Sequence, residues 1–315
     1  MNYFFHVIQT KFSPIMLANI AMMITVVAWG TSFISTKIIL VEIPPITLAF
    51  VRFFITSLIL YTIIKKTEPH TVVANSDKLK LALAGFIGIS VYFYFENTGI
   101  KLTTASNASL ITSFVPILSI TLNMLFFKAR LNGLEVIGVL IGIVGAYLTV
   151  TANGNIDFSS DNFKGNLYMI GAMIAWAVYT ILSKQMQQKY SGLFILTYQT
   201  IFATITLLPF SFLESDQWQT FSGSTFSQIL YLATICSALG YFLYGYALKT
   251  VDVVITTLYL NCVPVVGVVS GYFILNEQIL PIQILGGAII ILAIFVTNLD
   301  KTLLFLKKKG KEQIQ

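Results

Sequence analysis

Two charged residues lie inside stretches of the chain that are otherwise apolar, and they are the residues best placed to do chemistry. Arg52 lies about seven residues into an apolar segment that begins near residue 45, and Glu96 lies about five residues before Lys101, near the end of another. At 1.5 Å per helical residue, both would sit roughly 7–10 Å below the same membrane face. A charge at that depth is costly and usually faces a partner or a wet cavity.

The residues alone leave two uses of this pair open. In the first, Glu96 binds a cationic group or a proton at the mouth of a cavity, and the pair acts in binding or coupling. In the second, Arg52 and Glu96 form a structural ion pair that locks two helices, or Arg52 extends its charge toward the headgroups.

Other side chains within apolar segments are candidates to line the same cavity. Asn261 precedes Pro264 by three residues, and the proline ring removes a backbone donor and clashes one turn back, which predicts bends at Pro116 and Pro264 beside the pathway. Tryptophan and tyrosine offer flat walls with polar tips, although packing and headgroup belts are their commoner use. The expected substrate-binding residues are Trp29, Tyr92, Glu96, Asn107, Trp176, Tyr244 and Asn261.

Composition places the chain in a membrane. Of its 315 residues, 56% are apolar and 10% are charged, and the mean hydropathy is +0.82. A soluble domain carries about 25% charged residues. This chain has too few to cover a surface that faces water, so its outer surface must face lipid. A spanning helix needs about 20 apolar residues, and ten such stretches are expected at 16–38, 45–65, 79–99, 104–127, 132–150, 165–184, 191–213, 226–247, 252–274 and 280–299.

The sequence repeats itself after about 148 residues. Trp29 recurs as Trp176, and Pro116 recurs as Pro264. Five spans in each copy would place the copies in opposite orientations, which is the inverted-repeat architecture of secondary transporters. The expected fold is therefore all-α and integral to the membrane, with ten helices in two inverted five-helix repeats at 16–150 and 165–299, an N-terminal segment at 1–15 and a basic tail at 300–315.

Basic residues predict how the chain is oriented. If the N-terminus is cytoplasmic, fifteen lysines and arginines face the cytoplasm and three face outward, with Arg52 inside a span. This asymmetry predicts that both termini are cytoplasmic in a multi-pass protein of the cytoplasmic membrane. The distribution of the basic residues that give the net charge of +6 therefore indicates membrane orientation, and no nucleic-acid partner is expected.

Several short motifs, in order and duplicated, resemble the EamA-type permeases of the drug/metabolite transporter superfamily. They are Ala28–Phe33, Glu96–Gly99, Thr104–Ala108 and Leu275–Glu277. The resemblance implies a ten-helix carrier whose central cavity is lined by the first, third and fourth spans of each repeat. It also implies substrates such as amino acids, other small metabolites or toxic compounds, often exported. One departure is that Ala129 stands where the repeat would match Glu277.

The expected function is secondary transport of a small organic metabolite by alternating access, with amino-acid or related metabolite export favoured by the resemblance. Export of lipophilic cations or drugs is a second interpretation, and a non-transporting membrane sensor is a third. No enzyme is expected, because the spans lack histidine and paired aspartates, and no metal or cofactor is expected. The expected partners are a small solute and membrane lipid.

Glycines recur along one predicted face of two spans. They are Gly138, Gly142 and Gly145 in one span, and Gly286 and Gly287 in another. Such stripes permit close helix contact, either in a homodimer or within one chain, and the second is the expected use.

Overall fold

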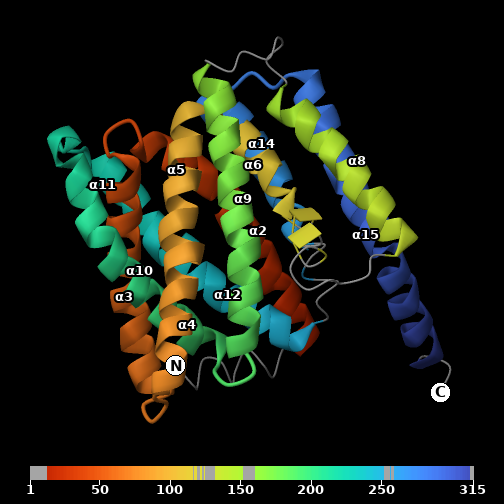
Figure 1. Cartoon of the computed structure of the whole chain (residues 1–315), viewed down its shortest axis with the longest axis horizontal. Coiled ribbons are helices and arrows are strands. Elements are labelled where there is room, and N and C mark those ends of the chain that lie inside the picture. Colours follow the sequence, from red (N-terminus) through yellow and green to blue (C-terminus); the bar gives the residue numbers. More distant parts are fainter. Residues whose placement is uncertain are drawn as a thin grey trace.

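The structure, a computed structural model, describes residues 13–115, 117–118, 121–122, 124, 132–151, 160–251, 256 and 259–312, and this part of the chain is helical (Figure 1). Side chains at 150, 184–185, 248–249 and 297–312 are not described. The helical elements are α2 (Pro14–Ile39), α3 (Pro45–Thr67), α4 (Asn75–Gly85), η1 (Phe86–Val91), α5 (Tyr92–Leu102), α6 (Ala105–Thr112), α8 (Gly133–Val150), α9 (Asp161–Met186), α10 (Gly192–Ser211), η2 (Phe212–Gln217), α11 (Gly223–Tyr231), η3 (Leu232–Leu239), α12 (Gly240–Thr250), α14 (Val263–Leu275) and α15 (Pro281–Glu312).

Six described helical segments are long and apolar enough to cross a membrane, and three shorter apolar helices accompany them. The expected spans at 104–127 and 252–274 include positions outside the described residues, so the count of ten remains a prediction. α2 begins and α15 ends toward the same face, the lower one in Figure 1. The all-helical membrane architecture is as the sequence predicts.

α8 and α15 pack side by side at one edge of the molecule (Figure 1). The contact depends on glycine, because a Cβ built on Gly145 would lie 2.8 Å from the carbonyl oxygen of Gly286. Small residues let two backbones approach closely where lipid gives no hydrophobic driving force. The glycine stripe therefore packs helices within one chain, which is the use expected from the sequence.

Replacing Gly145 with Leu is expected to destabilise the protein by about 1–3 kcal/mol, because the added side chain meets backbone that cannot move aside. Gly133→Leu is the matched control in the same helix, since nothing lies within 4 Å of a Cβ built there. The melting temperature in detergent checks the difference. Equal melting temperatures for the two variants would contradict the packing role of Gly145.

Two carboxylates fasten α3 and α10 to each other at their ends. Glu214, just beyond α10, accepts hydrogen bonds from the backbone N–H groups of Ile46 (3.0 Å) and Thr47 (2.7 Å) at the start of α3. Glu68, just beyond α3, accepts a hydrogen bond of 2.5 Å from the hydroxyl of Ser191, the N-cap of α10. Carboxylates favour helix N-termini, where backbone donors lack partners. These hydrogen bonds join α3 and α10 at both of their ends.

Two further segments each contain a π-helical turn. η1 joins α4 to α5, and η3 joins α11 to α12. Such wide turns are rare and occur often at functional sites. α5 begins at Tyr92 and α12 at Gly240, a separation that matches the repeat offset of about 148 residues seen in the sequence. Both turns lie beside the buried core cluster that surrounds the centre of the molecule.

Candidate functional site

A cavity of about 180 Å³ lies among α2, α3, α5, the end of α6, α9, α12 and the start of α14. This volume is well above what one buried water needs. Its walls are mainly apolar and carry several polar side chains, as is usual for sites that bind small organic molecules. The aromatic wall consists of Trp29, Phe33, Tyr92, Phe93, Trp176 and Tyr241.

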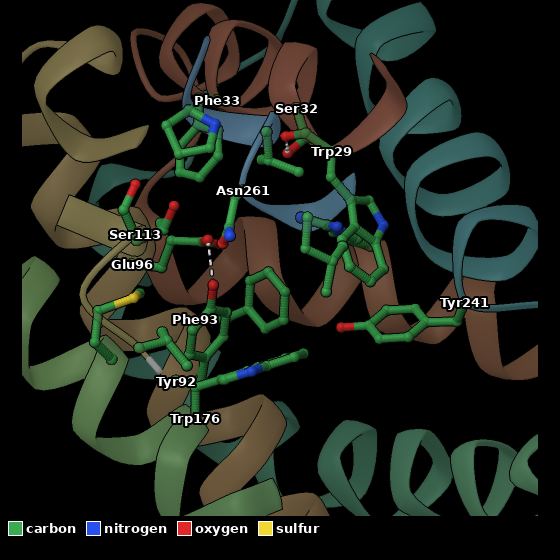
Figure 2. A pocket seen from close by; sticks show the side chains of 17 residues that line it. Trp29, Ser32, Phe33, Tyr92, Phe93, Glu96, Ser113, Trp176, Tyr241 and Asn261 are labelled. Carbon is green, nitrogen blue, oxygen red and sulfur yellow. Dashed lines mark hydrogen bonds between the residues drawn. The ribbon is translucent and has the colours of Figure 1, made fainter. Parts of the chain in front are cut away.

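Three polar side chains from different segments meet on one side of this cavity. Figure 2 shows Glu96, Ser113 and Asn261 close together, with the hydroxyl of Tyr92 pointing at Glu96. That hydroxyl donates a hydrogen bond of 2.6 Å to Oε1 of Glu96. The Ser113 hydroxyl and the Asn261 Nδ2 are buried and have no hydrogen-bond partner among the described residues. We call Glu96, Ser113 and Asn261 the polar corner.

An unpaired buried polar atom carries the full cost of its lost hydration, about 1–3 kcal/mol. Most such atoms in folded proteins therefore have a partner. Two such atoms lie beside a carboxylate in a mainly apolar cavity, and a ligand can satisfy them. The polar corner is thus the part of the cavity equipped to recognise a polar head group.

The polar corner forms where two helices are interrupted. Ser113 lies in the turn after α6, and Asn261 lies in the turn before α14. Pro264 occupies the first turn of α14, where its missing N–H costs no hydrogen bond. Pro264 therefore lies at the start of a helix beside the cavity, directly after a turn. Pro116 lies outside the described residues.

Arg52 is held by its own partners and not by Glu96. Its Nε donates a hydrogen bond of 2.9 Å to the hydroxyl of Ser237, and its guanidinium carbon lies 4.6 Å from the centre of the Phe93 ring. Arg52 is 5% exposed, so it does not extend to the headgroups. Arg52 and Glu96, whose side chains are both described, line the cavity, but no ion pair within 4.0 Å joins them. A structural lock between Arg52 and Glu96 is therefore not seen.

The two tryptophans both line the cavity but differ in their contacts. Trp29 donates a hydrogen bond of 2.9 Å from its indole nitrogen to the carbonyl oxygen of Cys236, inside the π-helical turn η3. Its ring centre lies 5.3 Å from that of Tyr241. The ring of Trp176 lies 5.2 Å from that of Tyr92, and no hydrogen bond from its indole nitrogen is found in the described part of the chain.

Replacing Trp29 with Phe is expected to lower transport about two- to tenfold with little loss of stability. The variant keeps an aromatic wall but loses one hydrogen bond, worth about 0.5–1.5 kcal/mol. Trp176→Phe is the matched comparison, because it removes no such hydrogen bond. It should therefore lower transport less than Trp29→Phe does. The initial rates of transport in proteoliposomes measure the difference. Equal losses of transport rate in the two variants would contradict the role of this hydrogen bond.

Two residues expected in the cavity do not line it. The Nδ2 of Asn107 donates a hydrogen bond of 2.6 Å to Oδ1 of Asn166, at the start of α9 and away from the polar corner. Tyr244 lies behind Trp29, with ring centres 5.5 Å apart. Conversely, the cavity includes side chains outside the set of expected substrate-binding residues, among them Ser32, Phe93, Ser113 and Tyr241. Ser113 was discoverable, because it precedes Asn261 by the repeat offset and each lies three residues before a proline.

A second cavity lies near the opposite edge of α3, between the loop after α2 and the loop before α11. Its lining is almost wholly apolar, and Glu42 stands at its rim. The backbone N–H of Ser222 donates a hydrogen bond of 2.7 Å to Glu42 and lowers the pKa of that carboxyl. Because this cavity offers few polar groups, the central cavity is the better candidate site.

Comparison with known proteins places this fold in a family. The model of the EamA-like transporter family matches twice, over residues 16–151 and 163–299. An uncharacterized transporter from Archaeoglobus fulgidus is 29% identical over 281 residues, which cover 89% of this chain and 96% of that protein. A crystal structure of a protein with 17% sequence identity superposes with a TM-score of 0.62 over 91% of this chain and 98% of that one, so the two share a fold.

Some relatives have names that mention a substrate. A probable terminal-alkyne amino-acid exporter from Streptantibioticus cattleyicolor is 26% identical over 88% of this chain and 92% of its own length. A probable amino-acid metabolite efflux pump from Salmonella typhimurium is 25% identical over 87% of this chain and 92% of its own length. These relatives are transporters and not enzymes. The chain belongs to the EamA-like transporter family and is a multi-pass membrane transporter.

Proposed function

We propose that the protein exports an amino acid or a related small metabolite across the cytoplasmic membrane by alternating access to the central cavity. The polar corner is the observation that carries this proposal. It joins Glu96 and Ser113 from the first half of the chain to Asn261 from the second half, so a bound solute touches both halves. A carrier that rocks its two halves about a midplane site needs such a shared site.

An inverted-repeat architecture supports the same proposal. The repeats are proposed at 16–150 and 165–299, flanked by an N-terminal segment at 1–15 and a basic tail at 300–315. Ser113 and Asn261, which occupy equivalent repeat positions, flank the same cavity, and the family model matches once in each half. Both chain ends are proposed to be cytoplasmic, as the basic residues predict. That orientation places the turn between α5 and α6 on the outer face.

The polar groups suit the head group of an amino acid. The free oxygen of the Glu96 carboxylate accepts hydrogen bonds from an ammonium, and the Asn261 Nδ2 donates to a carboxylate. Arg52 supplies a positive charge elsewhere in the lining, with its guanidinium fixed against Phe93. The aromatic wall then packs against an apolar or aromatic side chain of the solute.

Counterflow in proteoliposomes tests this function. Vesicles that contain the purified protein are loaded with unlabelled amino acids, one at a time, and uptake of the labelled amino acid is followed. At least one amino acid should show saturable counterflow that protein-free vesicles lack. Absence of counterflow with the whole amino-acid panel would overturn the amino-acid proposal.

Export of lipophilic cations is the second candidate, because Glu96 lies within an aromatic cavity and aromatic faces attract cations. The same vesicles, loaded with a cationic dye, distinguish the two functions. Dye transport without amino-acid counterflow would favour the drug exporter. Tight amino-acid binding without flux would instead favour a non-transporting sensor.

A further inference from the structure

Glu277 joins the loop after α14 to the start of α6. Its carboxylate accepts hydrogen bonds from the backbone N–H groups of Ala105 (2.7 Å) and Ser106 (2.9 Å), and from the Ser106 hydroxyl (2.5 Å). These donors have no partner within α6, because the first turn of a helix leaves its N–H groups unpaired. A carboxylate at that position is stabilised by hydrogen bonds and by the helix dipole.

The backbone conformation at Asn276 and the glycine at 271 allow Glu277 to reach α6. Asn276 has a left-handed conformation with φ of 52°, the only positive φ of a non-glycine residue in the described chain. It ends α14 and turns the chain back, so that the Glu277 N–H donates to the carbonyl oxygen of Gly271 at 3.2 Å. A Cβ on Gly271 would lie 2.7 Å from Oε2 of Glu277, so glycine is needed for this close approach.

Lys37, at the end of α2, fastens the other side of the same turn. Its Nζ donates hydrogen bonds to the carbonyl oxygens of Ile100 (2.7 Å), Lys101 (3.0 Å) and Thr103 (2.5 Å) at the end of α5. Cations are stabilised at helix C-termini, where carbonyl groups lack partners. The turn between α5 and α6 is thus held by a cation on its carbonyl side and by a carboxylate on its amide side.

The repeat does not preserve the carboxylate. The position equivalent to Glu277 in the first half is occupied by Ala129, which has no group that accepts hydrogen bonds from helix N–H groups. In the proposed orientation, Glu277 belongs to the outer face and Ala129 to the cytoplasmic face. The two faces of the carrier therefore differ in a contact that joins its two halves.

We propose that Lys37 and Glu277 form a clamp on the turn between α5 and α6 that holds the outer face closed. Glu277 is the part that joins the two repeats, and Lys37 joins α2 to α5 within the first. With no carboxylate at the equivalent inner position, the resting protein favours the state that is closed outside and loads solute from the cytoplasm. This bias suits an exporter, and it depends on the proposed alternating access. Solute binding at the polar corner would have to be followed by release of Glu277 from α6.

Distance measurements across the clamp test this proposal. Nitroxide labels are attached to Lys101→Cys and Gln278→Cys, both exposed positions, in a chain that also carries Cys236→Ala and Cys262→Ser. Pulsed electron paramagnetic resonance in liposomes should give mainly one short distance with Glu277 present. Glu277→Gln should raise the ratio of long to short distances about tenfold, because charge-assisted hydrogen bonds are lost.

Glu135→Gln is the matched control, because Glu135 caps the start of its own helix, α8. Its distance distribution should match that of the parent. Ser106→Ala removes one of the three bonds and should shift the ratio in the same direction by a smaller factor, which keeps the test valid if Glu277→Gln folds poorly. Unchanged distances in both clamp variants, or an equal shift with Glu135→Gln, would overturn the clamp.

Different experimental outcomes would contradict the clamp and the proposed function. Absence of counterflow in wild-type vesicles would remove the carrier proposal and leave the distances interpretable. Unchanged distances together with normal counterflow would remove the clamp alone.

Discussion

Glu96→Gln is expected to lower the specificity constant for amino-acid counterflow roughly 10- to 100-fold, with the protein still folded. The substitution keeps the shape of the side chain and its hydrogen bond from Tyr92 but removes the charge that binds an ammonium. Hydrogen bonds to a charged group contribute about 1.5–3 kcal/mol, which gives that range. Counterflow of a labelled amino acid at several concentrations measures the loss, and the melting temperature checks folding.

The interpretation depends on which kinetic parameter changes. A loss of substrate binding should raise the half-saturation concentration, whereas a folding defect should lower the amount of active protein at every concentration. Thr112→Val is a suitable control, because Thr112 lines the cavity while its hydroxyl bonds to its own helix at the carbonyl of Ser109. Full activity in Glu96→Gln would contradict the role of the carboxylate.

Arg52→Met is expected to lower amino-acid counterflow about tenfold while the stability changes little. Methionine keeps much of the length and packing of the arginine stem. Arg52 forms no ion pair within 4.0 Å among the described residues, so the substitution leaves no carboxylate without a paired cation. The lost guanidinium no longer attracts the carboxylate of the solute. An amine without a carboxylate should therefore be transported as well by this variant as by the wild type.

The double variant Arg52→Met/Glu96→Gln separates the two interpretations of this pair. If each charge binds a different end of the solute, the double variant should lose at least as much activity as the more impaired single variant. If the pair were a structural lock, removing both charges should restore much of what one removal costs, because no unpaired charge remains. Restored counterflow in the double variant would contradict the roles assigned here.

Much of the architecture could be predicted from the sequence. Apolar stretches of about 20 residues correspond to α2, α3, α9 and α10 within a few residues, because length and hydropathy largely decide where a chain crosses a membrane. Trp29, Tyr92, Glu96, Trp176 and Asn261 line the central cavity, and their role in substrate binding stays a prediction. These residues are polar or aromatic within apolar segments, which is a signal that a single sequence carries.

The remaining parts depend on contacts between distant segments. Asn107 resembles a cavity residue in sequence, yet its Nδ2 donates a hydrogen bond to Asn166 on another helix, and the side chain does not line the central cavity. Arg52 and Glu96 lie at similar depths, but their partners are Ser237 and Tyr92, and depth alone does not choose among partners. Ser113 by itself resembles a serine that bonds its own helix, and only its equivalence to Asn261 in the repeat marks it in the sequence. The helix break after Thr112 leaves its hydroxyl without a partner among the described residues.

The measurement that most directly tests the central claim is block of transport by modification inside the cavity. Ser32 lines the cavity, whereas Val27 on the same helix is 54% exposed and faces away from the core. Ser32→Cys and Val27→Cys are made in a chain with Cys236→Ala and Cys262→Ser, then treated with a bulky methanethiosulfonate reagent. We predict that modification stops amino-acid counterflow in Ser32→Cys and leaves Val27→Cys active. Undiminished counterflow in fully modified Ser32→Cys would contradict the claim that solute passes through this cavity.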